Sequence, residues 1–191
     1  MNAGHGTLQG GTIPAAVVAA AHDRPSAPAL VSEEGTITFA VLVRLVDGYA
    51  AALAGAGVRP GAVVGQVVGD RPIDLAMQLA LFRAGAATFA LMPQEAPAPR
   101  RALLDRLGAE ICVGAAADRG GQDGAWVDYE ELSADADPRG LPRLPVPGDV
   151  AHYNRSSGTT GEAKLVGITH AQRAIRAARE TAGFRRRRDD R

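Results

Sequence analysis

The pattern of hydrophobic and polar positions switches between helical and strand spacing along most of the chain. Near the N-terminus, the apolar run from Ile13 to Ala21 predicts a short helix that Thr12 and Pro14 open. Two short runs, Ala29 to Val31 and Thr36 to Phe39, flank a Gly-containing turn and predict a β-hairpin. A longer helix should follow, because apolar residues recur there at spacings of three and four until Gly55 and Gly57 end it. Its apolar residues are Leu42, Leu45, Val46, Tyr49 and Leu53.

The next segments predict a buried strand followed by a buried helix. Ala62 to Val68 is apolar except for one Gln, as expected for a strand covered on both faces. In the helix after it, Asp70 is the expected N-cap and Pro72 lies in the first turn. Apolar residues surround most of this helix, which predicts packing inside the fold, with Met77 as part of the core. These residues are Ile73, Leu75, Ala76, Met77, Leu79, Ala80, Leu81, Phe82 and Ala84.

A second strand, a third helix and a third strand continue the alternation. Thr88 to Met92 is the expected strand, and Pro93 ends it. Pro97 and Pro99 precede a helix whose leucines should point inward and whose arginines should point outward, and Glu110 to Val113 is the next strand. The inward leucines are Leu103, Leu104 and Leu107. This order predicts an α/β fold with a parallel sheet covered by helices and joined by right-handed crossovers.

The segments after this alternation predict an edge strand and a linker. Trp126 to Tyr129 is the short edge strand, and the prolines from Pro138 to Pro147 indicate an extended linker. Val150 to Tyr153 and Leu165 to His170 are apolar and β-branched runs around a Gly-rich loop, which is typical of strand–loop–strand. A helix is expected from about Ala171 to Thr181.

The loop itself reads Ser156-Ser157-Gly158-Thr159-Thr160-Gly161-Glu162-Ala163-Lys164. Glycines let the backbone approach a phosphate closely, and hydroxyls and backbone N–H groups donate hydrogen bonds to phosphate oxygens. A lysine adds a compact, mobile positive charge. The composition therefore predicts binding of a polyphosphate, although Ser, Thr and Gly also gather in ordinary turns.

Lysine usage in the rest of the chain favours the phosphate interpretation. Lys and Arg together number 21, and Lys164 is the only Lys among them. A chain that otherwise uses Arg throughout thus places its one ammonium group at the end of this loop. The spacing differs from the P-loop of NTPases, which needs Gly, four residues and then Gly-Lys-Ser/Thr. Here two residues separate Gly161 from Lys164, and Leu165 follows.

The loop resembles the signature loop of the acyl-adenylate-forming ligases, whose usual form is Ser-Gly-Thr-Thr-Gly-x-Pro-Lys-Gly. Ala163 replaces the Pro of that form, and Leu165 replaces the Gly after the Lys. The Lys164–Leu165 pairing is similar to the subset that activates aryl acids, such as dihydroxybenzoate–AMP or salicylate–AMP ligases of siderophore assembly. Residues 79–86 and 89–93 also resemble that subset. The resemblance runs from about Ile13 to His170.

This resemblance implies a domain organisation and a two-step activity. Residues 13–184 would be the first part of the large N-terminal domain of an adenylate-forming enzyme, preceded by a disordered tail at 1–12 and followed by an Arg-rich tail at 185–191 outside the family. ATP with Mg²⁺ would activate a carboxylic acid as an acyl adenylate, and a thiol of CoA or a carrier protein would then take the acyl group.

The resemblance also assigns roles within the loop. Ser156, Ser157, Thr159 and Thr160 would donate to phosphate oxygens, Gly158 and Gly161 would give close approach, and Lys164 would supply the catalytic positive charge. The chain shows no metal ligand, no adenine-binding motif and no C-terminal catalytic lysine of the family. It is therefore expected to be a ligase fragment that is inactive alone. The alternative is a non-catalytic truncated product or an interaction module with at most weak phosphate binding.

The amino-acid composition narrows the kinds of partner and the cellular location that we expect for the protein. The 191 residues are 46% hydrophobic and 22% charged, as in a globular protein. A formal net charge of zero and 4% aromatic residues argue against nucleic acids and anionic membranes as partners. The single cysteine, Cys112, lies in an apolar run and is expected in the core. No basic N-terminal segment or membrane-length apolar run is present, so a cytoplasmic protein is expected.

The other candidate residues predict no second site. Four histidines, His5, His22, His152 and His170, lack metal-ligand spacing, and His170 is interpreted as structural. Glu130, Glu131 and residues 135–137 lie in polar sequence and should be solvated. Ser157 lacks the Gly-x-Ser-x-Gly context of a hydrolase nucleophile.

Overall fold

The computed structural model of the protein describes residues 11–121, 123–156 and 164–183. Its α-helices are α1 (Ile13–Asp23), α2 (Phe39–Gly55), α3 (Pro72–Arg83), α4 (Pro97–Leu107) and α5 (His170–Gly183), with short 3₁₀ helices η1 (Ala116–Asp118) and η2 (Pro138–Gly140). Its strands are β1 (Pro28–Ser32), β2 (Gly35–Thr38), β3 (Val63–Val67), β4 (Ala87–Leu91), β5 (Ile111–Gly114), β6 (Ala125–Asp128), β7 (Val150–Ser156) and β8 (Lys164–Thr169). Each helix and strand expected from the sequence has a counterpart here.

Six strands form the main sheet, in the order β6-β5-β3-β4-β7-β8. Neighbours from β6 to β7 run parallel, and β7 and β8 form an antiparallel pair at one edge. The predicted α/β fold with a parallel sheet is therefore confirmed, as is the edge position of β6. Strands β1 and β2 form a separate antiparallel hairpin.

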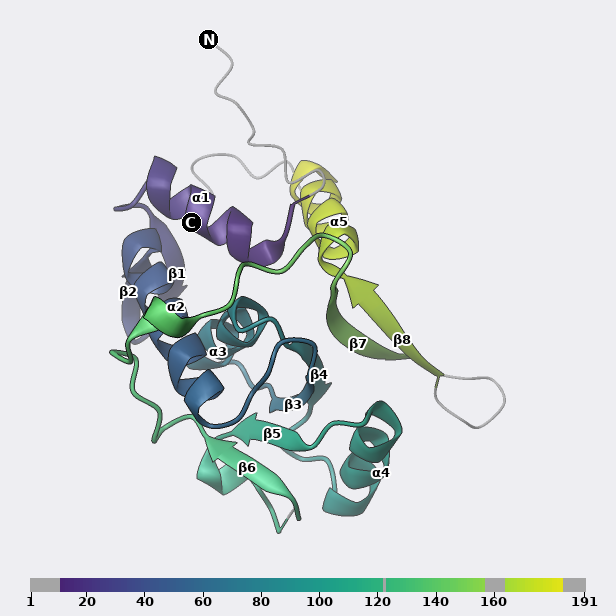
Figure 1. The fold of residues 1–191 in the computed structure, drawn as a ribbon. Coiled ribbons are helices and arrows are strands. Elements are labelled where there is room, and N and C mark those ends of the chain that lie inside the picture. The colour runs from purple at the N-terminus through teal and green to yellow at the C-terminus, as the bar shows by residue number, and fades with distance from the viewer. Residues whose placement is uncertain (1–10, 122, 157–163, 184–191) are drawn as a thin grey trace.

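Helices cover both faces of the main sheet (Figure 1). Helices α2 and α3 pack on one face, where Met77 and Leu81 meet Val64 and Val113. Helix α4 packs on the other face, where Leu104 meets a second set of buried residues. That set includes Val67, Phe89, Leu91 and Cys112. The expected core positions of Met77 and Cys112 are confirmed, with exposed fractions of 0% and 3%.

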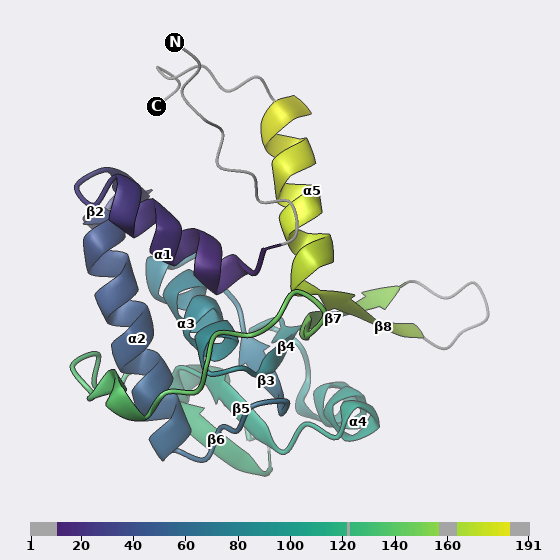
Figure 2. The ribbon, with the colours of Figure 1, turned by 45° about the horizontal axis from the view of Figure 1, so that its top comes forward.

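Helix α1 and the hairpin form a further layer outside α2 and α3, as both views show (Figure 2). Thr12 opens α1 as predicted, because its Oγ1 accepts a hydrogen bond from the N–H of Ala15 at 3.3 Å. Gly57 follows the end of α2 with a φ of +104°, a conformation that favours glycine. No helix among the described residues has the length and apolarity needed to cross a membrane.

Three expectations about side chains in α3 and α4 are wrong. Asp70 is exposed and does not cap α3; the carboxylate of Asp74, one turn into the helix, accepts from the backbone N–H of Arg71 instead. Leu75 is 43% exposed, because it faces an open hollow between the start of α3 and β1 and is not packed in the core. Arg100 is only 1% exposed, since backbone carbonyls from two other segments surround its guanidinium.

Candidate functional site

The strands on either side of the Gly-rich loop form a two-stranded ribbon at the sheet edge. Ser156 ends β7 and is the register partner of Lys164, the first residue of β8. The Ser156 hydroxyl donates to the backbone carbonyl of Lys164 at 3.4 Å. The structure thus brings together the first and last residues of the predicted phosphate loop. The other proposed binding residues, Ser157, Gly158, Thr159, Thr160 and Gly161, lie outside the described residues.

The two faces of this ribbon have different surroundings. Register partners in an antiparallel pair project to the same face, so Ser156 and Lys164 share a face with the pair Asn154 and Val166. All four residues are exposed. On the opposite face, Tyr153 and Leu165 pack against the core beneath α4. The ribbon therefore presents an open, polar face that carries a hydroxyl and an ammonium group.

Among the residues that the structure describes, none blocks the Lys164 ammonium group from binding an anion. Its side chain is exposed, and no carboxylate of the described residues forms an ion pair with it. A free ammonium beside a hydroxyl can donate charge-assisted hydrogen bonds to phosphate oxygens. The described part of the chain contains no group of three His, Cys, Asp or Glu residues that could hold a metal ion.

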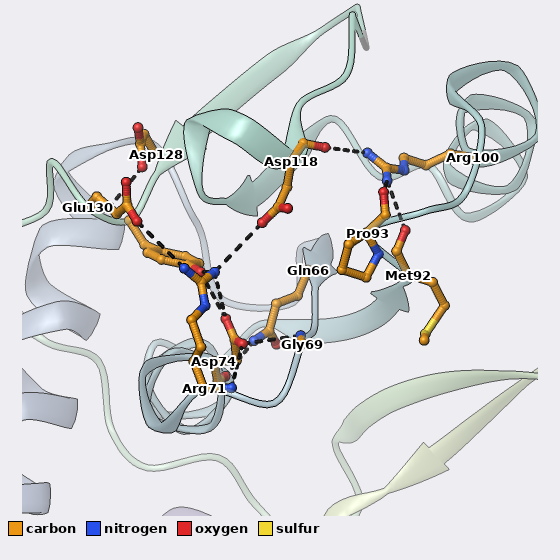
Figure 3. Close-up of polar contacts among 11 residues, drawn as sticks. Gln66, Gly69, Arg71, Asp74, Met92, Pro93, Arg100, Asp118, Asp128 and Glu130 are labelled. Carbon is orange, nitrogen blue, oxygen red and sulfur yellow. Dashed lines mark hydrogen bonds and ion pairs between the residues drawn. The ribbon is translucent and has the colours of Figure 1, made fainter. Parts of the chain in front are cut away.

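A second polar cluster lies where β3 and β5 end (Figure 3). The Asp74 carboxylate accepts from the backbone N–H groups of Gly69 and Arg71, both at 3.2 Å, and from the Tyr129 hydroxyl at 2.9 Å. The Arg71 guanidinium lies 3.6 Å from Asp74, 3.7 Å from Asp118 and 3.6 Å from Glu130. It also donates to the Tyr129 hydroxyl. Because protein groups engage Arg71 and Asp74 on several sides, this cluster joins α3 to β6.

Arg100 forms a third polar centre, next to the cluster around Asp74 (Figure 3). Its guanidinium donates to the carbonyls of Asp118 at 3.0 Å, Met92 at 2.9 Å and Pro93 at 3.3 Å. It thereby ties the turn after β4 to the segment after β5. A buried arginine whose two terminal nitrogens donate to backbone carbonyls has a structural role. In the sequence, only the Pro residues at the start of α4 indicated a turn here.

An open hollow of about 330 Å³ lies beside the turn between β3 and α3, and it does not coincide with the ribbon. Arg71, Leu75 and Ser32 are among the residues that line it. Neither Ser156 nor Lys164 reaches it. The ribbon remains the stronger candidate because it carries the residues whose chemistry suits phosphate.

Two histidines lie where the ribbon joins the core. His170 is 1% exposed and meets the Phe82 ring edge-on, with the centroids 5.2 Å apart. Burial lowers its pKa, as does Arg173, while Asp149 opposes the shift. Burial also lowers the pKa of His152 to about 4, helped by Arg173 and other nearby positive charge. Both rings are therefore neutral at neutral pH, in line with a structural role for His170.

Comparison with known proteins identifies relatives of this fold and sequence. A profile described as AMP-binding enzyme matches residues 17–191. The AMB antimetabolite synthetase AmbE of Pseudomonas aeruginosa is 34% identical over 155 residues, which are 78% of this chain and 7% of AmbE. The chain therefore spans only a small part of that relative.

Solved structures show the same architecture. VinN superposes with a TM-score of 0.82 over 95% of this chain and 52% of VinN, at 20% identity. The nonribosomal peptide synthetase FmoA3 superposes with a TM-score of 0.79 over 92% of this chain and 19% of FmoA3, at 23% identity. At such identities the likeness concerns the fold, which is that of the N-terminal domain of adenylation enzymes.

Proposed function

The chain belongs to the AMP-binding enzyme family, and from this premise we propose that it is the first part of an ATP-dependent ligase that joins a carboxylic acid to AMP. In this reaction the carboxylate attacks the α-phosphate of ATP, forms an acyl adenylate and releases pyrophosphate. The thiol of CoA or of a carrier protein then accepts the acyl group as a thioester, and AMP leaves. The observation that carries the proposal is the pairing of Ser156 with Lys164 on the exposed face of the β7–β8 ribbon.

Charge explains what these residues contribute. Negative charge grows on the leaving pyrophosphate, and groups aimed at it lower the barrier. Lys164 supplies a mobile positive charge and Ser156 a hydroxyl donor at the base of the loop. Ser157, Thr159 and Thr160 would add donors, and Gly158 and Gly161 would allow the backbone to approach the β- and γ-phosphates.

Magnesium would accompany the nucleotide, because Mg²⁺ in such sites is held largely by phosphate oxygens and water. It would neutralise part of the phosphate charge. The exposed Lys164 and Ser156 fit the anionic phosphates, whereas the described residues offer no metal-binding group of their own. The role of these two residues is thus to bind and orient the phosphates.

We further propose an aryl acid as the substrate. Support comes from the resemblance of the Lys164–Leu165 pair and of residues 89–93 to aryl-acid ligases. Phe89 and Leu91 are buried against α4, and Leu165 packs on the same core, so these residues shape the domain and do not contact the acid.

Nucleotide binding to the full chain tests the role of Lys164. Calorimetry would compare ATP, tripolyphosphate, AMP and adenosine with the wild type, Lys164→Ala and Lys164→Arg. Lys164→Ala should weaken triphosphate binding by about 1.5–3 kcal/mol, the range for hydrogen bonds to charged groups. Adenosine binding should change little. Arg139→Ala, which removes an exposed arginine of η2, is the charge-matched control. An equal loss for all four ligands would remove Lys164 from the proposed role.

Domain grafting tests the resemblance to aryl-acid ligases, on which the substrate proposal rests. Residues 13–170 would replace the matching segment of an aryl-acid ligase and, separately, of a fatty acyl-CoA ligase. Exchange of pyrophosphate into ATP should be higher in the aryl-acid chimera. Activity confined to the fatty-acyl chimera would overturn the aryl-acid assignment and leave the general ligase proposal intact.

A further inference from the structure

The end of the β7–β8 ribbon has little support from the rest of the sheet. Strand β4 pairs with β7 at only two register positions, Thr88 with His152 and Phe89 with Tyr153. Strand β7 nevertheless continues to Ser156, paired only with β8. In both ribbon views this end points away from the body of the molecule (Figures 1 and 2). The position of Ser156 and Lys164 therefore depends on contacts made beyond the sheet ladder.

One polar contact joins this end of the ribbon to the turn after β4. An Nη1 nitrogen of Arg155 lies 2.9 Å from Oε1 of Glu95 and donates a hydrogen bond to it. Glu95 belongs to the turn between β4 and α4, and its backbone N–H donates to the Met92 carbonyl at 3.0 Å. The Arg155 side chain is 47% exposed, whereas the Glu95 side chain is only 15% exposed.

Because Glu95 is the less exposed partner, its side chain depends more on this contact than that of Arg155 does. A carboxylate that has lost most of its water needs a partner, because a buried unpaired charge is costly. Glu95 sits in a turn that is held by its own backbone bond and by the Arg100 contacts to Met92 and Pro93. The turn therefore holds Glu95 in a fixed position, and the Arg155 side chain binds to it there.

Arg155 and the candidate phosphate-binding residues lie on opposite faces of the ribbon. Arg155 is the register partner of Leu165, so both project to the α4 side of the ribbon. Leu165 packs against the core there. Ser156 and Lys164 project to the opposite face. A contact made through Arg155 can therefore hold the ribbon without occupying the face that carries the hydroxyl and the ammonium group.

We propose that the Glu95–Arg155 ion pair is a positioning device that holds Ser156 and Lys164 in place relative to the carboxyl end of β4. This inference rests on the proposed function, in which those two residues bind the phosphates of ATP. Arg155 and Glu95 are positioning residues, and neither touches the nucleotide.

Amide hydrogen exchange of the full chain tests the positioning directly and needs no ligand. The variants are Glu95→Gln, Arg155→Gln, the double variant, and the charge swap Glu95→Arg with Arg155→Glu. Each single variant should speed exchange at protected amides of residues 154–156 and 164–166 by about two- to fivefold, the range for a partly exposed ion pair. The double variant should be no faster than either single variant, and the swap should recover part of the protection.

A control variant and control amides show whether the change in exchange is specific to the ribbon. Arg139→Gln breaks the exposed ion pair of Arg139 with Asp137 and should leave the ribbon amides unchanged. Amides of β3 report whether a variant is globally destabilised. Unchanged ribbon exchange in both single variants, or additive effects in the double variant, would overturn the proposal.

Tripolyphosphate affinity separates positioning from direct binding. If the pair positions the ribbon, Glu95→Gln and Arg155→Gln should weaken binding by the same factor of about two to five. A loss in Arg155→Gln alone would mean that Arg155 contacts the phosphate, which overturns the positioning role. If the wild type binds no triphosphate, the proposed function fails, while the exchange result still decides whether the pair positions the ribbon.

Discussion

Gly48 in α2 lies directly beneath the backbone carbonyl of Ala134: a Cβ built on Gly48 would stand 1.7 Å from that oxygen. Real Cβ atoms do not come this close to another heavy atom. The segment between β6 and η2 therefore rests on α2 through an approach that only glycine permits. Leu132 and Leu141 in the same part of the chain pack against the core beside α2 and α3.

We expect Gly48→Ala to destabilise the protein. The new methyl group must push the backbone of Ala134 away, and overpacking of this kind costs about 1–3 kcal/mol. Gly55→Ala is the matched control, because Gly55 lies in the same helix and a Cβ added there would meet no atom within 4 Å. Denaturant unfolding should show a lower midpoint for Gly48→Ala only. Equal stability of the two variants would show that the backbone after β6 can move away from α2 without a loss in the free energy of unfolding.

Replacing Arg100 with Met should lower stability by about 2–3 kcal/mol. The substitution keeps most of the side-chain volume but removes the guanidinium donors from the carbonyls of Asp118 and Pro93. Arg101→Met is the control, because Arg101 is a partly exposed neighbour that pairs with Asp105. Its replacement should shift the unfolding temperature much less, because a solvent-exposed ion pair contributes little to stability. Thermal unfolding of both variants gives the comparison, and similar shifts would contradict a special role for Arg100.

Asp74→Ala and Asp70→Ala test which carboxylate supports the start of α3. Asp74 accepts from Gly69, Arg71 and Tyr129 and is buried, so its loss should cost about 2 kcal/mol. Asp70 is exposed, and its replacement should change stability by less than about 0.5 kcal/mol. Urea unfolding measures both. A larger loss for Asp70→Ala would restore the cap expected from the sequence.

Stability should fall as pH decreases from about 6.5 toward 4. The pKa of His152 is about 4 in the folded protein, below the ordinary value of 6.5. Between these values the unfolded chain takes up a proton that the folded chain excludes, so folding loses free energy as pH falls. His170 shifts in the same direction. Since His152 is partly solvated, we expect it to contribute about 1 kcal/mol between pH 7 and pH 5.

His152→Asn should flatten this pH dependence, because the substituted side chain does not titrate. His22→Asn makes the same substitution at an exposed histidine and is the matched control. Unfolding midpoints measured from pH 7.5 to pH 4.5 give the slopes. A wild-type slope retained in His152→Asn would assign the pH dependence to other groups.

Much of the fold could be predicted because the determining signals are local. Apolar and β-branched runs identified the strands, a spacing of three and four identified the longest helix, and Gly57 and Thr12 marked helix ends through their own backbone and side-chain preferences. The order of these elements was enough to predict a parallel sheet. The Gly-rich loop likewise identified Lys164 as the candidate cation, because its chemistry depends on neighbouring residues along the chain.

The contacts that position the candidate site could not be predicted, because they join residues far apart in sequence. Sequence periodicity states which residues share a face, but not which backbone groups or charges that face will meet. Arg100 is buried because carbonyls after β4 and β5 surround it, and Glu95 pairs with Arg155 because β7 lies beside β4. The amino-acid sequence determined the elements and the chemistry of the loop. The tertiary structure alone decided which long polar side chains are buried, since burial depends on where distant segments supply hydrogen-bond partners.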